Sequence, residues 1–520
     1  MKRKQVISCV LAGAVLFGTQ QAWAATSHYN DSSLTGDSGA WASYVAGWEG
    51  MANDFTNVSL TPGAAATELN FAWYNEGAAG SPTVYFGTDR QDLKAYRGAS
   101  NTVEPSLTQG RQFCYNYVTV TGLKPNTTYY YSVDKSGTKS PVETYRTGSF
   151  DNVNILYFGD PQIGASKGQP QGEGMLSEST GAANTAARND GFAWDRTLDI
   201  ALEKNPDINF AISAGDQVNN TGNAKEEEYA AYLSASALKS LPVATTIGNH
   251  DSLNPDYSYH FNNPNPTNMG KTQAGGDYYY NYGPGLFIVL NTNNYNVAEH
   301  EETIKQAVAA YPDAAWRVVT IHQDIYGSGL DHSDTDGMIL RTQLTPVFDR
   351  YDIDVVLQGH DHTYSRSKLL YGDGQTHDSY EFRLNEAGDD YDWDNAYNNQ
   401  TGEKIPLYPA AEDADGQQAL QRFARDNRCY TIEEAGNSVV TDPKGTLYMT
   451  ANSASGSKYY ELTNTQQDYI ANRSQNWLPS YSIIEMDYDD FSITTYQITD
   501  TGSVETIDNT FTIHKTVGRG

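Results

Sequence analysis

The sequence predicts a multidomain protein in which an all-β sandwich precedes a larger domain that mixes strands and helices. Between residues 58 and 147, short runs of apolar and aromatic residues are separated by turn residues, a spacing typical of a β-sandwich. From Asn154 onward, strand-like runs alternate with helical segments, which indicates a largely parallel sheet. A length of 520 residues is sufficient for two or three domains.

The N-terminus has the pattern of a secretory signal peptide, residues 1–24. Three cationic residues are followed by an apolar run from Val6 to Phe17 and then by the small-residue motif Ala22-Trp23-Ala24. The apolar run is too short to cross a bilayer, and no other segment has a transmembrane pattern. We therefore expect cleavage before Ala25, a secreted or extracytoplasmic protein, and no association with a membrane.

The composition is strongly acidic. The formal charge is −30, and the loss of three signal-peptide cations would change it to −33. This charge argues against a nucleic-acid-binding surface, but it does not exclude a small anionic substrate, because bound metal ions supply local positive charge. Outside the signal peptide only Cys114 and Cys429 remain. They could form one disulfide, but they are too few for a disulfide scaffold or a thiolate metal site.

Residues 25–150 are expected to form a small, polar leader, up to about residue 55, and then the sandwich. The segment Thr121–Tyr129 resembles the E–F corner of fibronectin type III domains, where a leucine packs inward and a tyrosine turns the corner. The region shows no cluster of catalytic residue types, so we interpret it as a packing or positioning domain. Its clearest strand-like runs are residues 68–73, 83–87, 117–120 and 128–133.

Residues 151–520 form the second predicted domain. The pattern breaks at about residues 372–443, an acidic insertion rich in Tyr, Asn and Gly that is either a lid or a decorated loop beside the site. Strand character resumes at residues 446–450 and ends in an antiparallel pair, residues 481–486 and 492–496. The predicted strands before the insertion are 155–158, 208–212, 243–247, 285–290, 316–321 and 353–357, and the predicted helices are 192–204, 224–239, 301–310 and 338–351.

Five of these strands end in residues that bind metals. Open α/β sheets place their sites at the carboxyl ends of strands. Oxygen and imidazole ligands without thiolate suit Zn, Fe or Mn, and one bridging carboxylate would let six ligands hold two ions. Each residue alone could be a helix cap, a core histidine or a turn residue, but their shared position at strand ends favours a metal centre. The six candidate ligands are Asp160, Asp216, Asn249, His322, His360 and His362.

Together these strand ends resemble the five-block signature of calcineurin-like metallophosphoesterases, in the family's order, from about residue 154 to 366. The blocks are Gly159-Asp160, Gly215-Asp216, Gly248-Asn249-His250-Asp251, Ile321-His322 and Gly359-His360-Asp361-His362. A preceding fibronectin-like domain is similar to the purple acid phosphatase branch. The resemblance implies a four-layer α/β/β/α catalytic domain that follows the β-sandwich.

The resemblance also implies a role for each position. Asp160 and His362 would hold the first metal ion and Asp216 would bridge. Three further residues would hold the second ion, namely Asn249, His322 and His360. Catalytic roles fall to His250, which would stabilise the phosphoryl group or protonate the leaving oxygen, and to His332, which matches a substrate histidine of the purple branch.

Two positions depart from the patterns of the family. Gln162 stands where many members have a histidine two residues after the first Asp. Asn219 stands where the purple branch has the tyrosine that binds ferric iron. We therefore expect no iron–tyrosinate centre, and Asn219 or water could fill the missing ligand position.

These features predict a secreted dinuclear-metal enzyme that hydrolyses phosphomonoesters by attack of a metal-bound hydroxide. A phosphodiesterase or nucleotidase using the same metals is the alternative. A rival from another class is an inactive surface-binding protein whose metal is structural. The expected partner is a small phosphorylated substrate, and the sequence leaves the oligomeric state open.

Overall fold

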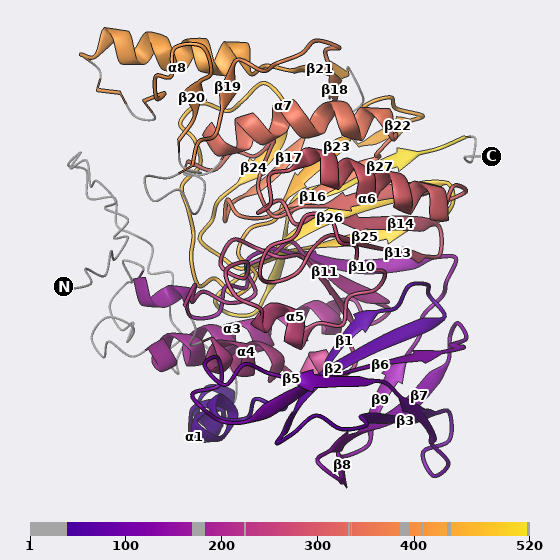
Figure 1. Cartoon of the computed structure of the whole chain (residues 1–520). Helices are drawn as coiled ribbons and strands as arrows, with labels where there is room; N and C mark the ends of the chain where they lie inside the picture. The colour runs from indigo at the N-terminus through magenta and orange to yellow at the C-terminus, as the bar shows by residue number, and fades with distance from the viewer. Residues whose placement is uncertain are drawn as a thin grey trace, which may run out of the picture.

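The computed structural model describes residues 39–168, 183–222, 225–330, 333, 335–384, 395–406, 409–410, 412–433 and 438–516. The predicted signal peptide and His332 lie outside these residues, so both stay predictions. Figure 1 shows the β-sandwich at the bottom, the two large sheets with their helices above it, and helix α8 at the top.

The N-terminal domain is a sandwich of two antiparallel sheets, with orders β1-β2-β6-β5 and β4-β3-β7-β8, and with β9 beside β7. Side chains such as Phe71 and Tyr131 alternate inward and fill its core. At the predicted corner Leu123 is buried, and the Tyr129 hydroxyl accepts a hydrogen bond from the Lys124 N–H at 2.8 Å. The strands are β1 (Ser59–Pro62), β2 (Glu68–Glu76), β3 (Thr83–Gly87), β4 (Lys94–Arg97), β5 (Ala99–Thr102), β6 (Phe113–Thr121), β7 (Thr128–Lys135), β8 (Thr138–Lys139) and β9 (Glu143–Arg146).

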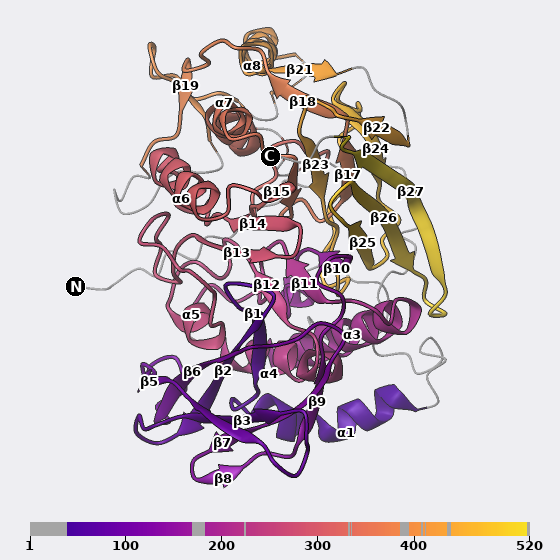
Figure 2. The same ribbon diagram turned by 90° about the vertical axis from the view of Figure 1, so that its right-hand side faces the viewer.

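The second domain has the four-layer α/β/β/α architecture, which confirms the predicted fold class (Figure 2). Its first sheet has the order β12-β11-β10-β25-β26-β27-β22 and its second the order β13-β14-β15-β16-β23-β17-β24. The strands of the first sheet are β10 (Val153–Phe158), β11 (Phe210–Ser213), β12 (Val243–Thr245), β22 (Val439–Thr441), β25 (Ser480–Met486), β26 (Asp490–Ile498) and β27 (Val504–His514). Those of the second are β13 (Tyr278–Tyr282), β14 (Gly285–Val289), β15 (Trp316–Thr320), β16 (Val355–Gln358), β17 (Tyr364–Ser367), β23 (Leu447–Thr450) and β24 (Ile470–Ser474).

Helices cover the outer face of each sheet. Trp194 of α3 packs with Leu156 and Phe158, whose side chains point away from the second sheet, while Leu344 of α7 packs with Val356. Helix α1, in the leader, packs on α3, since Trp48 and Ala52 belong to the same buried cluster as Trp194. The predicted helix over 224–239 divides into α4 and the 3₁₀ turn η2. The helices are α1 (Ala40–Ala52), α3 (Ala183–Lys204), α4 (Glu226–Leu233), α5 (Asp256–His260), α6 (Val297–Ala310) and α7 (Thr335–Arg350), with η1 (Ala165–Gly168) and η2 (Ser236–Lys239).

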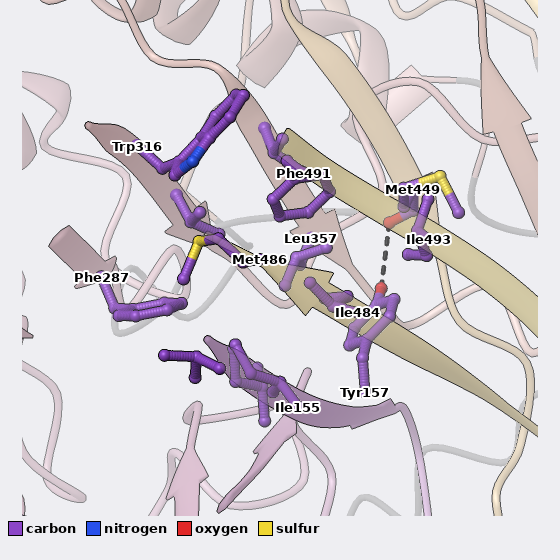
Figure 3. Packing of buried hydrophobic residues seen from close by; sticks show 14 of the residues in the cluster. Ile155, Tyr157, Phe287, Trp316, Leu357, Met449, Ile484, Met486, Phe491 and Ile493 are labelled. Atoms are coloured by element: carbon purple, nitrogen blue, oxygen red, sulfur yellow. Dashed lines mark hydrogen bonds between the residues drawn. The ribbon is translucent and has the colours of Figure 1, made fainter. Parts of the chain in front are cut away.

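The two sheets pack face to face through a continuous apolar core (Figure 3). Tyr157 of β10 crosses this interface, and its hydroxyl donates to the carbonyl of Met449 at 3.0 Å and accepts from the N–H of Gln358 at 3.0 Å. One side chain of the first sheet thus ties two strands of the second, β16 and β23.

We expect Tyr157→Phe to lower the free energy of unfolding by about 1–3 kcal/mol, because a buried backbone donor and acceptor lose their partner. Urea unfolding followed by tryptophan fluorescence measures this change. The matched control is Tyr280→Phe, since the buried Tyr280 hydroxyl has no hydrogen-bond partner among the residues that the structure describes. Equal losses in the two variants would contradict this role of the Tyr157 hydroxyl.

The insertion has a small fold of its own. β18 (Leu369–Gly372) pairs with β21 (Tyr430–Glu433), β19 (Tyr380–Glu381) pairs with β20 (Tyr397–Asn398), and β22 joins the first sheet beside β27. Phe423 of α8 (Ala414–Asp426) packs with Ile339 of α7. For its described residues, this packing on the outer helix layer favours the decorated loop over the lid.

Two further predictions concern membranes and cysteines. Among the described residues, no helix combines the length and apolarity needed to span a membrane. Cys114 and Cys429 are both buried free thiols, so the structure decides against the disulfide that the sequence left open. Cys114 lies in β6 of the sandwich, whereas the Cys429 thiol lies 3.9 Å from the Tyr326 hydroxyl in the second domain.

Candidate metal centre

The six predicted ligands converge from both sheets. In the first sheet, parallel strands β10, β11 and β12 deliver Asp160, Asp216 and Asn249 just beyond their carboxyl ends. In the second sheet, parallel strands β15 and β16 deliver His322, His360 and His362. Because the two sheets pack face to face, these two sets of loops meet at one edge of the sheet–sheet interface, beyond the carboxyl ends of the strands.

The backbone of the ligand loops is held in the left-handed region. The φ angles are 47° at Asp160, 49° at Asp216, 71° at His360 and 47° at His362. Each such residue costs about 1–3 kcal/mol, and strain of this kind clusters at functional sites because the surrounding structure maintains it. These turns aim consecutive polar side chains into one small volume.

Two glycines allow this close approach. A Cβ on Gly248 would lie 2.0 Å from Asp216 Oδ1, and a Cβ on Gly215 would lie 2.4 Å from His322 Nδ1. Both distances are far below van der Waals contact. These two positions therefore require glycine, because a side chain would occupy the space of the neighbouring predicted ligands.

The ligand atoms form two groups that share one carboxylate. Asp216, His322 and His360 lie within 4.8 Å of one another, and so do Asp160, Asp216 and His362. The Asn249 Oδ1 lies 2.9 Å from His322 Nε2 and extends the first group. All six predicted ligands are thus brought together, in the grouping that the resemblance implied.

The spacing of these atoms fits metal ions. His322 Nε2 lies 3.5 Å from Asp216 Oδ1, and His362 Nε2 lies 3.6 Å from Asp160 Oδ1. Two ligands bonded at about 2.1 Å in tetrahedral geometry are about 3.4 Å apart. The separations are therefore those of donors that share an ion.

Backbone carbonyls orient two of the imidazoles. His322 Nδ1 donates to the carbonyl of Ala214 at 2.9 Å, and His362 Nδ1 donates to the carbonyl of Lys458 at 2.8 Å. Each bond places the proton on Nδ1 and leaves the Nε2 lone pair directed at the ligand group. This arrangement is usual for metal-binding histidines.

The electrostatics of the site also favour bound cations. The Asp160 and Asp216 side chains are buried side by side. Burial, and next the charge of Asp216, raise the pKa of Asp160, whereas burial lowers the pKa of His362. Neighbouring carboxylates in a dry site need compensating positive charge, and neutral imidazoles cannot supply it. The donor set therefore fits one or two metal ions.

His250 lies beside the ligands at the edge of the site. Its Nδ1 contacts the carbonyl of Asn219, its Nε2 lies 4.0 Å from Asp216 Oδ2, and its side chain is 21% exposed. The backbone is fixed by a bond from the His250 N–H to Asp216 Oδ1 (3.0 Å) and by a bond from Lys225 Nζ to the His250 carbonyl (2.7 Å). His250 therefore presents one ring nitrogen between the ligands and solvent.

The two residues that depart from the family pattern contact each other. The Gln162 Nε2 donates to the Asn219 Oδ1 at 3.4 Å. The buried Gln162 Oε1 has no hydrogen-bond partner within the described part of the chain, which leaves this oxygen available as a ligand near Asp160. Glu228 accepts hydrogen bonds from the N–H groups of Asn219 and Asn220. Burial raises the pKa of Glu228 to about 8.

A third loop borders the site and was not predicted from the sequence. It comprises residues 451–461, and we call it the serine loop. It follows β23, the parallel neighbour of β16. Ser453 donates to the carbonyl of Asp160 at 3.1 Å, and Ser457 to that of Pro161 at 3.2 Å. The signal was present in the sequence, since the predicted strand 446–450 ends at this polar segment, but only the pairing with β16 shows that it reaches the site.

Family comparisons assign both domains. Residues 55–147 match the purple acid phosphatase N-terminal domain, and residues 153–364 match the calcineurin-like phosphoesterases. The first match spans the sandwich, and the second ends two residues after His362.

The chain also resembles individual proteins. Two uncharacterized proteins from different strains of Mycobacterium tuberculosis are each 24% identical to it over 349 residues. The alignment covers 59% of this chain and 61% of each relative, so less than two thirds of their length is matched. The solved purple acid phosphatase PPD1 from yellow lupin (Lupinus luteus) seeds has the same fold, with a TM-score of 0.57, 14% identity, and coverage of 88% of this chain and 75% of that chain. This chain therefore contains a calcineurin-like phosphoesterase domain that follows a purple acid phosphatase N-terminal domain.

Proposed function

We propose that this protein hydrolyses phosphate esters with the help of two metal ions, and that phosphomonoesters are its substrates. The observation that carries the proposal is the position of Asp216, whose carboxylate belongs to both ligand groups. A carboxylate shared by both groups could bridge two ions about 3.5–4 Å apart, the spacing of two-metal hydrolytic sites.

Each residue has a defined task in this proposal. Asp160 and His362 would hold one ion, while Asn249, His322 and His360 would hold the other. When bound, Zn, Fe or Mn ions polarise a phosphoryl group and acidify a water molecule. His250 contacts the phosphoryl group or the leaving oxygen from the solvent side, and the neighbouring backbone bonds hold its ring in place. His332 stays a predicted substrate residue.

The finer claims have separate support. The purple acid phosphatase N-terminal domain favours a monoesterase over a phosphodiesterase or nucleotidase. The signal-peptide pattern in residues 1–24 supports activity outside the cytoplasm. Asn219 in place of a tyrosine supports a centre without an iron–tyrosinate bond.

The first test is hydrolysis of p-nitrophenyl phosphate and of bis-p-nitrophenyl phosphate after chelation and then restoration of Zn, Mn, Fe or Mg. We expect chelation to abolish turnover, and one of these metals to restore it with the monoester as the faster substrate. Faster turnover of the bis-ester would instead identify a phosphodiesterase. Folded protein that is inactive with every metal would favour the surface-binding rival.

A further inference from the structure

We propose that Lys458 binds the phosphate group of the substrate through its side-chain ammonium group. The inference rests on the proposed function and deepens it. It names a residue that neither the motif blocks nor the matched range 153–364 contains, because Lys458 lies in the serine loop after β23.

The main chain of Lys458 is held by the metal ligands. Its carbonyl accepts the Nδ1–H of His362 at 2.8 Å. Ser455 and Ser457, just before it, both donate to the carbonyl of Pro161, which follows Asp160. The backbone of Lys458 is therefore attached to both predicted ligands of the first ion, and its position depends on the same contacts that orient them.

The side chain of Lys458 is guided by an aromatic ring that faces the site. Its Nζ lies 4.6 Å from the centroid of the Tyr460 ring, and that ring meets the His362 imidazole edge to face at 5.2 Å. Gln475 Nε2 donates to the carbonyls of both Tyr460 and His362 at 2.7 Å, so one side chain links the backbones of these two residues. This geometry keeps the ammonium group beside the ligands while the side chain stays half-buried.

The charge of Lys458 reaches the predicted ligands. Its ammonium group is close enough to interact electrostatically with Asp160, His362 and His250.

A cation beside a metal centre affects metals and phosphate in opposite directions. It repels the ions, so it offers no advantage for holding them, but it attracts the oxygens of a phosphate bound there. In a protein with a formal charge of −30, a local ammonium group also offsets the repulsion that a phosphate dianion would meet.

The test compares Lys458→Met, which removes the charge, with Lys458→Arg, which keeps it. Lys444→Met is the matched control, because Lys444 Nζ lies 4.0 Å above the Tyr371 ring but the residue precedes β23, at the opposite end of that strand. The full-length mature chain is loaded with the metal that it retains best. Binding of inorganic phosphate is measured by calorimetry, and metal affinity is measured separately by chelator competition.

We expect Lys458→Met to weaken phosphate binding by about tenfold or more, with metal affinity unchanged or several-fold higher. Lys458→Arg and Lys444→Met should stay within about twofold of the wild type. Unchanged phosphate binding in Lys458→Met, a parallel loss of metal and phosphate affinity, or no phosphate binding by the wild type would each overturn the inference. Since binding is measured without turnover, an inactive wild type would refute the proposed function and leave this result readable.

Discussion

Replacing Asp216 by asparagine should empty both metal positions and reduce ester hydrolysis by at least about a thousandfold, which corresponds to about 4 kcal/mol of transition-state stabilisation. The carboxylate is the one group common to the two ligand sets. A neutral amide keeps the shape but cannot compensate two cations. Metal content by mass spectrometry, together with turnover of p-nitrophenyl phosphate, measures the effect.

Asp277→Asn is the matched control for this variant. Asp277 is also a fully buried carboxylate, but it bonds His300 at 2.8 Å and lies outside both ligand groups. We expect the control to lose stability and keep its metals. If Asp216→Asn retained two ions per chain, the bridging role would be wrong.

The same position distinguishes the enzyme from its rival. For a surface-binding protein with a structural metal, the wild type would not hydrolyse esters, and binding of the partner would survive in Asp216→Ala. For the proposed enzyme, hydrolysis is present in the wild type and is lost in that variant. The two hypotheses therefore predict opposite results for the wild-type protein before any variant is made.

Replacing His250 by asparagine should lower kcat by about 100- to 1000-fold while both metals remain bound. An asparagine amide can still reach the carbonyl of Asn219, which accepts from His250 Nδ1, but it provides nothing at the position of Nε2. Ligand geometry should therefore survive, and only contacts to the substrate are lost.

The choice of substrate separates the two roles of His250. If its ring protonates the leaving oxygen, the loss should be much larger for an alkyl phosphate than for p-nitrophenyl phosphate, whose leaving group needs no acid. Equal losses would indicate stabilisation of the phosphoryl group. His514→Asn, at a half-exposed histidine that bonds Asp490, controls for the substitution itself. Wild-type kcat in His250→Asn would remove this residue from the mechanism.

The sequence by itself determined the fold class and the set of candidate metal ligands. Both depend on local signals, since buried strands show in runs such as residues 155–158 and ligand residues follow directly at the strand ends. The strands and helices of the catalytic core accordingly lie close to their predicted ranges. These elements could be predicted because a strand or helix of this kind is specified by the pattern of the residues within it.

The sequence predicted the terminal antiparallel pair, which β25 and β26 confirm, but it did not show how most other strands pair. Strand β25 lies antiparallel to β10, and β27 closes on β26, although these segments are far apart in sequence or only weakly patterned. Leader helix α1 was missed as well, because the segment before residue 55 was interpreted as small and polar, although α1 carries the buried aromatic residues Trp41 and Trp48. Pairing and docking depend on long-range burial, which periodicity does not encode.

Only the tertiary structure showed several of the contacts that complete the site. It placed Asp216 in both ligand groups, as the resemblance implied, and it alone showed that Gln162 and Asn219 contact each other and that the serine loop brings Lys458 to His362. Each of these facts joins residues from different strands. Their distances are set by the packing of two sheets against each other, and no local pattern in the sequence records that packing.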